Sequence, residues 1–165
     1  MSTSIYEEGI KEASKNNTDK RFPNSSVAHA RLLIKEIINN SDKELWLLSS
    51  TFHESFYKGL ETEFKTFLSD DAHKINVIVS ENSDGLVDRL KSSFSDNFIV
   101  KKIPKSSFPK DNESKEYINY IVNDTNAYRY EYNETEIDEG IVQAIANFNN
   151  EKEATLLIDN FKSLV

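Results

Sequence analysis

The chain contains no cysteine, and this absence excludes several kinds of chemistry. Without thiols there is no disulfide framework, no cysteine-ligated zinc or iron–sulfur cluster and no thiol nucleophile. Glycine occurs only four times and at scattered positions, so no glycine-rich loop is present to cradle a phosphate. No apolar run approaches the roughly 20 residues of a membrane-spanning helix, and the N-terminus lacks the features of a secretory signal. We therefore expect a cytoplasmic protein with no membrane contact.

Positive charge is scarce relative to negative charge. The formal net charge is −8, and residues 103–165 hold 6 basic and 12 acidic side chains. Acidic residues are densest between 131 and 139, where the spacing matches no cation-binding loop, so we interpret them as a solvated face. An acidic surface repels phosphate backbones, so direct nucleic-acid binding is not expected. No motif for a metal or a cofactor occurs, and we expect neither.

A length of 165 residues is that of one ordinary domain. Residues 1–24 are expected to form a short helix near 7–14 and a polar connector that Pro23 interrupts. Residues 25–165 are expected to form a single α/β domain. The expected helices are 27–38, 54–68, 85–93, 136–146 and 151–164, and the expected strands are 44–49, 74–79, 98–100, 117–123 and 127–132. The alternation of strands and helices up to residue 100 predicts a parallel sheet with helices on its faces.

Three histidines are available as catalytic groups: His29, His53 and His73. His29 falls within an amphipathic helix and His73 within a turn, so both are interpreted as surface residues. His53 follows strand 44–49, and open parallel sheets place their ligand sites at this end of their strands. The simpler interpretation makes His53 the first residue of the next helix, and the alternative makes it a catalytic group.

Several segments of the second half resemble the C-terminal part of phospholipase D-like domains. They are 119–124, 127–131, 146–149 and 154–157, the last leading to Phe161. In that superfamily a strand carries a histidine, a turn follows, and the next strand leads to a small-residue–Asn–Phe string and a closing helix. The first half is similar too, because a helix ending at Ile38 precedes strand 45–48. The resemblance covers residues 25–165 and implies a phospholipase D-like mixed, largely parallel sheet with helices on both faces.

The resemblance also implies that catalysis is lost. Active members use a His-x-Lys-x-x-x-x-Asp motif, in which histidine attacks the phosphodiester and lysine neutralises phosphate charge. Here Asn119 stands at the histidine position, Ile121 at the lysine position and Asn126 at the aspartate position. An amide cannot act as nucleophile, general acid or general base, and a hydrocarbon cannot hold phosphate. The vestigial site then comprises Asn119, Asp124, Arg129, Glu131 and His53.

Two hypotheses of different classes follow. The first is a non-catalytic interaction module that binds a protein partner or a second copy of itself, since active single-motif relatives pair two chains. Five tyrosines on or beside strands 117–123 and 127–132 support it, because tyrosine suits both cores and interfaces. A sharper version makes the acidic face a mimic of nucleic acid that inhibits a DNA-binding protein.

The second hypothesis is a phosphodiesterase or nuclease with a rebuilt site. In it, His53 acts with Arg129, which could hold phosphate bidentately, and with Glu131, which could orient a base. The simpler interpretation of Arg129 and Glu131, two residues apart on one strand, is a structural ion pair on one face of the sheet.

Overall fold

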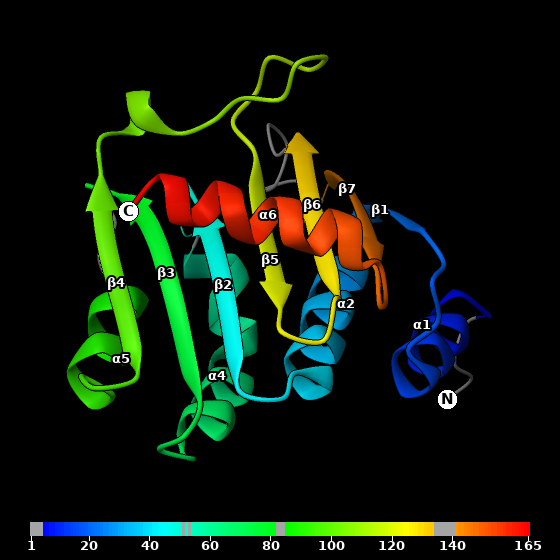
Figure 1. Ribbon diagram of the computed structural model, residues 1–165, viewed down its shortest axis with the longest axis horizontal. Helices are drawn as coiled ribbons and strands as arrows, with labels where there is room; N and C mark the ends of the chain where they lie inside the picture. Colours follow the sequence, from blue (N-terminus) through cyan, green and yellow to red (C-terminus); the bar gives the residue numbers. More distant parts are fainter. Residues whose placement is uncertain (1–4, 51, 53, 82–84, 134–140) are drawn as a thin grey trace.

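A computed structural model describes residues 5–50, 52, 54–81, 85–133 and 141–165 of the chain. The strands in these ranges form one seven-stranded sheet with the order β1-β7-β6-β5-β2-β3-β4 (Figure 1). Their bounds are β1 Phe22–Ser26, β2 Glu44–Ser49, β3 Lys74–Ser80, β4 Phe98–Ile103, β5 Asn119–Asn123, β6 Tyr128–Asn133 and β7 Ile141–Asn147. His53 and residues 134–140, which hold most of the acidic segment, lie outside the described residues.

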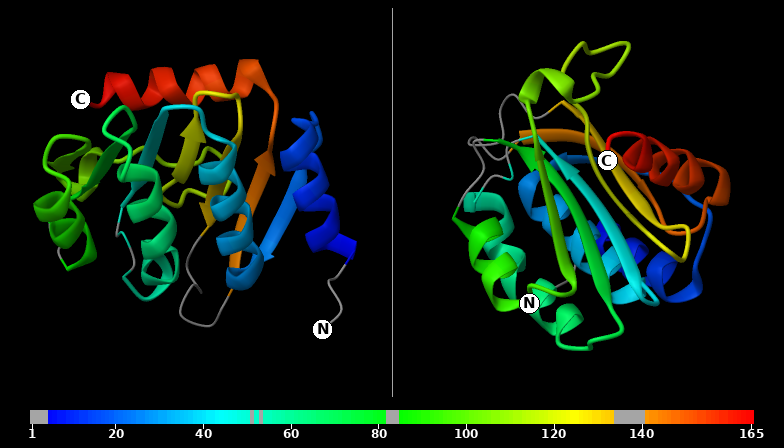
Figure 2. Two further views of the ribbon diagram at one scale, coloured as in Figure 1. Left: turned by 90° about the horizontal axis from the view of Figure 1, so that it is seen from below. Right: turned by 60° about the vertical axis from the view of Figure 1, so that its left-hand side comes forward.

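Helices lie on both faces of this sheet, as the sequence predicts. Their bounds are α1 Ile5–Asn16, α2 Val27–Asn40, α3 Glu54–Tyr57, α4 Glu61–Leu68, α5 Leu86–Ser93 and α6 Glu151–Ser163, with short 3₁₀ turns at Lys58–Leu60 and Lys105–Ser107. Figure 2 shows α6 on one side of the sheet and α1, α2, α4 and α5 on the other. The N-terminus of α2 is set as expected, because the Ser26 side chain accepts a hydrogen bond from the backbone N–H of His29.

The sheet is mixed, but the expectation that it is largely parallel is wrong. β2 pairs in parallel with β3, and β3 with β4. The pairs β1–β7, β7–β6, β6–β5 and β5–β2 are antiparallel. The reason lies in the connection after β4: the segment 104–118 passes along the upper edge of the sheet in Figure 1. β5 therefore starts at the end of the sheet where β2 finishes. It runs antiparallel to β2 because no crossover connection returns the chain to the other end of the strands.

Two further predictions of secondary structure are wrong. The sequence predicts a helix over 136–146, but Ile141–Asn147 is strand β7, held between β6 and β1. The polar connector expected before residue 25 contains β1, so the expected domain boundary between residues 24 and 25 falls inside a strand of the sheet. Pro23 is tolerated there because β1 pairs only with β7 among the described strands and needs backbone donors on one side only.

Side-chain alternation along the strands builds two cores, one on each face. The larger core lies under α1 to α5 and includes Leu47, Val77 and Ile121. The smaller core lies under α6 and includes Leu48, Ile78 and two strand tyrosines, Tyr120 and Tyr128. Tyr117, just before β5, packs against it. The tyrosines of β5 and β6 thus pack mainly beneath α6, which accounts for their concentration in the sequence.

Candidate functional site

A row of buried polar side chains crosses the larger-core face of the sheet near its upper edge. The register places Asn24 of β1 beside Ala144 of β7, Ala144 beside Glu131 of β6, and Glu131 beside Asn119 of β5. Asn24, Glu131 and Asn119 are each at most 5% exposed. Buried polar groups are costly unless they are hydrogen-bonded, so this row is the place to look for a function beyond packing.

Asn119 occupies the expected histidine position and is fixed by the chain that follows β2. Its Oδ1 accepts a hydrogen bond from the backbone N–H of Ser50 at 2.8 Å. Its Nδ2 is buried and has no hydrogen-bond partner among the described residues. Ser49 of β2 is engaged nearby, since its hydroxyl oxygen accepts from the backbone N–H of Phe52 at 2.9 Å. The Asn119 side chain therefore holds the end of β2 against the start of β5.

Arg129 and Glu131 form a buried ion pair on one face of the sheet next to Asn119, as their spacing predicts. Arg129 Nη2 lies 3.7 Å from Glu131 Oε1, and both side chains are at most 6% exposed. Arg129 Nε also donates to Asn24 Oδ1 at 3.1 Å. A separation of 3.7 Å is too long for a hydrogen bond, and Arg129 Nη2 has no hydrogen-bond partner among the described residues. The pair neutralises its own charge inside the sheet–helix layer.

Tyr6, which the sequence does not single out, lies close to Arg129. The Tyr6 hydroxyl of α1 donates to the Pro23 carbonyl at 2.8 Å, and its ring packs on His29 of α2 with centroids 4.3 Å apart. Burial raises the pKa of Tyr6, and the nearby Arg129 charge partly offsets this rise. His29 is therefore a half-buried residue that contacts α1, and Tyr6 lies near enough to Arg129 to feel its charge.

The other proposed site residues do not join this cluster in the described structure. Asp124 lies past the opposite end of β5, where its carboxylate accepts from the backbone N–H groups of Asp42, Lys43 and Glu44 at 2.8–3.1 Å. Ile121 is 2% exposed and lies in the larger core. The structure thus brings together Asn119, Arg129 and Glu131, and it separates Asp124 from them.

Metal-ligand clusters and membrane-spanning helices are both absent from the described residues. Within them, no three histidine, aspartate or glutamate side chains gather as a metal site requires. None of the helices in the described ranges combines the length and the apolar character needed to cross a membrane.

No protein-family model matches this chain, and no curated protein matches it. Solved structures do resemble it. TrmBL2, an archaeal chromatin protein whose structure shows a novel mode of DNA binding, aligns with a TM-score of 0.62 and 12% identity over 95% of this chain. NucT from Helicobacter pylori aligns with a TM-score of 0.59 and 8% identity over 89% of this chain and 96% of its own length.

Phosphatidylserine synthase from Haemophilus influenzae Rd KW20 aligns with a TM-score of 0.59 and 10% identity over 88% of this chain. The chain spans 57% of the length of TrmBL2 and 37% of that of the synthase. Identities this low establish the fold alone, which is the mixed α/β fold with helices on both faces of the sheet that the sequence predicts.

Proposed function

We propose that this chain is a non-catalytic phospholipase D-like domain that acts by binding a protein, either a partner or a second copy of itself. The observation that carries the proposal is the state of Asn119, at the position where active members of the superfamily have their nucleophile. Its amide oxygen is engaged by the Ser50 backbone, and the side chain is 2% exposed. An amide in this setting supplies neither a nucleophile nor a proton-transfer group.

The surroundings of Asn119 support the same conclusion. Ile121, at the expected lysine position, is part of the apolar core and leaves no cation to bind phosphate there. The nearby cation, Arg129, is paired with Glu131. A substrate phosphate would have to displace the Glu131 carboxylate from Arg129. The displaced carboxylate and the phosphate would then both carry negative charge in a buried site, which is costly.

A binding function also fits the range of proteins that share this fold. Phosphatidylserine synthase is an enzyme by name, whereas TrmBL2 is described as a chromatin protein. Binding without catalysis is therefore a role that the fold can support. For this chain we favour a protein partner over nucleic acid because its net charge of −8 opposes binding to a phosphate backbone.

A rebuilt phosphodiesterase centre is the second candidate, favoured by one observation. Asn119 Nδ2 and Arg129 Nη2 are buried N–H groups without hydrogen-bond acceptors among the described residues. Groups of this kind are often explained by a bound water or ligand. The two candidates are separated by assaying hydrolysis of bis(p-nitrophenyl) phosphate in chelator by the wild type and by Arg129→Met. No turnover by either supports the binding domain, and turnover that Arg129→Met abolishes in a folded protein supports the rebuilt centre.

A further inference from the structure

A groove lies on the α6 face of the sheet, away from the polar row. α6 contacts β5 and β2, and its C-terminal end reaches the upper part of β3, so it leaves β3 and β4 below that end uncovered on this face (Figure 1). The groove has a volume of about 190 Å³ and is lined by residues of β2, β3, β4 and the C-terminal end of α6.

The floor of this groove is mainly apolar, with Asn76 as its polar member. Trp46, Asn76 and Ile99 are aligned in register on three neighbouring strands, and Phe161 of α6 borders them. Trp46 is 8% exposed, but Ile99 is 41% exposed and Val165, which also lines the groove, is 65% exposed. Large aliphatic side chains exposed beside a buried tryptophan form the kind of apolar surface that protein partners cover.

The rim of the groove is basic in a protein that is otherwise acidic. Lys101 of β4 and Lys162 of α6 line it, and both are exposed. Neither forms an ion pair with another of the described residues. The acidic residue of the lining, Glu44, accepts a hydrogen bond from Asn76 Nδ2 at 2.7 Å. Residues 101–110 carry four lysines and no acidic residue, whereas the whole chain has a net charge of −8.

We propose that this groove binds an acidic amphipathic segment of a partner protein, with apolar side chains on the Trp46–Ile99 floor and carboxylates at Lys101 and Lys162. This inference rests on the proposed binding function and specifies the partner's chemistry. Charge complementarity selects an acidic segment, and the apolar floor requires that the segment also carry apolar residues.

Two other occupants fit less well. A second copy joined through the β4 edge would bring the Lys101 and Lys102 side chains of both chains together, and lysines on an edge strand oppose such pairing. A nucleic acid would extend beyond the short basic rim and meet the acidic remainder of the surface. A short acidic segment avoids both penalties.

Trp46 provides a direct reporter, since it is the chain's sole tryptophan and it lines the groove. The test is a fluorescence titration of the protein with a short amphipathic peptide that has leucine and glutamate at helical spacing and no tryptophan. We expect a saturable change in Trp46 emission. Ile99→Asp should weaken binding about tenfold or more because it removes buried apolar contact. Lys101→Glu with Lys162→Glu should weaken it about fivefold or more.

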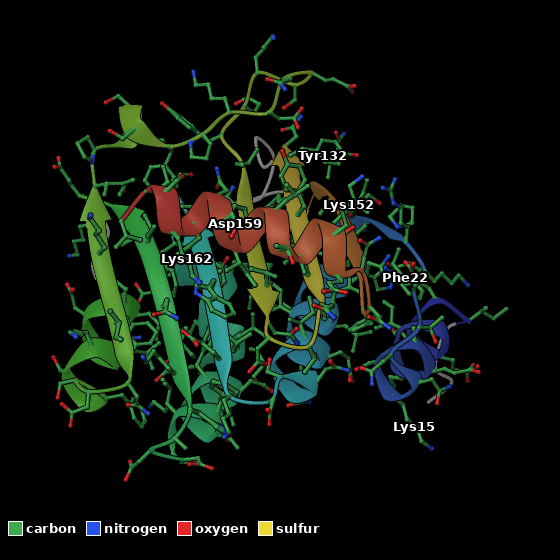
Figure 3. All side chains as sticks on the ribbon, viewed as in Figure 1. Lys15, Phe22, Tyr132, Lys152, Asp159 and Lys162 are labelled. Carbon is green, nitrogen blue, oxygen red and sulfur yellow. The ribbon has the colours of Figure 1, made fainter. Side chains whose placement is uncertain are left out.

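Matched controls use sites outside the groove. Lys152→Glu changes an exposed lysine at the other end of α6 (Figure 3), and Leu156→Asp changes another exposed aliphatic residue of the same helix. Both should leave the affinity unchanged, and thermal unfolding of every variant verifies that it is folded. A third titrant, oligothymidylate, should produce no change in emission.

The inference is overturned if the peptide does not bind, if its binding is unaffected by the groove variants, or if oligothymidylate binds in its place. Failure here is distinct from failure of the proposed function. Hydrolysis of bis(p-nitrophenyl) phosphate in chelator tests the proposed function without involving the groove. If the chain neither hydrolyses this reporter nor binds the peptide, the proposed non-catalytic function stands and the proposed peptide-binding site is refuted.

Discussion

Asn119 and Ile121 differ from a catalytic His–Lys pair in setting as well as in chemistry. Both side chains are 2% exposed, and Ile121 packs among apolar neighbours. We therefore expect that a histidine and a lysine at these positions would not form a working site, because a lysine at 121 would place an ammonium in the larger core without a partner. Both positions therefore belong to the packing of the fold.

The double variant Asn119→His with Ile121→Lys is expected to show no phosphodiesterase activity and a large loss of stability. Burying an uncompensated charge at 121 should lower the free energy of unfolding by about 3 kcal/mol or more. Urea denaturation followed by circular dichroism measures the loss, with Ile121→Met as a control that should cost less than about 1.5 kcal/mol. A stable double variant that hydrolyses bis(p-nitrophenyl) phosphate would show that a phosphate pocket has survived.

Tyr120 and Tyr130 are expected to make the stability of the fold sensitive to alkali. Burial raises the pKa of Tyr120, whose hydroxyl donates to Asn160 Oδ1 at 2.6 Å. Burial also raises the pKa of Tyr130, and the hydrogen bond to Asp111 and its negative charge raise it further. A raised pKa means that the folded state holds these protons more tightly than the unfolded state. Their contribution to stability is therefore complete below the ordinary tyrosine pKa of about 10 and falls as pH rises above it.

The matching experiment measures unfolding by urea at a series of pH values from neutral to strongly alkaline. The wild type should lose stability above about pH 10, and Tyr120→Phe and Tyr130→Phe should each flatten that loss. Tyr132→Phe, a change to another tyrosine of β6, serves as the control. Equal alkaline slopes for all four proteins would contradict the assignment.

Among the helices and strands, those with an unambiguous pattern were predictable from the sequence. α2 has both a capping serine and a regular apolar stripe, and β2 and β3 are short apolar runs of strand length. β7 was not predictable, because the alanines of Ile141–Asn147 suit a helix by propensity and are held in a strand by β6 and β1. Such tertiary pairing is invisible to local patterns. β1 was missed for a similar reason, since Pro23 argues against a strand unless the strand lies at an edge.

Asp124, in the turn between β5 and β6, was a candidate site residue but has a structural role. Asp124 holds the loop before β2 through three backbone N–H groups, those of Asp42, Lys43 and Glu44. Asp124→Ala should therefore lower the free energy of unfolding by about 2 kcal/mol, because it removes charge-assisted hydrogen bonds that join two segments distant in sequence.

Chemical denaturation measures this loss, and Asp159→Ala on the exposed side of α6 is the matched control, with an expected change within about 0.5 kcal/mol (Figure 3). A cost for Asp124→Ala no larger than that of the control would contradict the structural role. It would return Asp124 to the set of candidates for function.

For the molecule as a whole, the candidate site was only partly predictable. Strand alternation alone places Arg129 and Glu131 on one face, and the resemblance places Asn119 beside them. The contributions of Tyr6 and Asn24 depend on α1 and β1, which come from the opposite end of the chain. Long-range contacts of this kind leave no local signal in a single sequence.

Self-association is the whole-molecule property that the resemblance implies most directly, since active single-motif relatives pair two chains. We expect a homodimer in solution at high micromolar concentration. Sedimentation velocity measures it, and a lone species of 19.0 kDa would contradict it and direct the binding function to a different partner. Lys101→Glu should not change the sedimentation profile, because the groove at β4 is assigned to an acidic partner segment.

A hydrolysis assay with purified wild-type protein tests whether the chain binds without catalysing. The substrates are bis(p-nitrophenyl) phosphate and single-stranded DNA, both in chelator. We expect no turnover, because Asn119 supplies no nucleophile and loss of even one preorganised electrostatic contact costs about 10²–10³ in rate. Turnover that His53→Ala abolishes and that variants of exposed residues such as Lys152→Glu retain would contradict it.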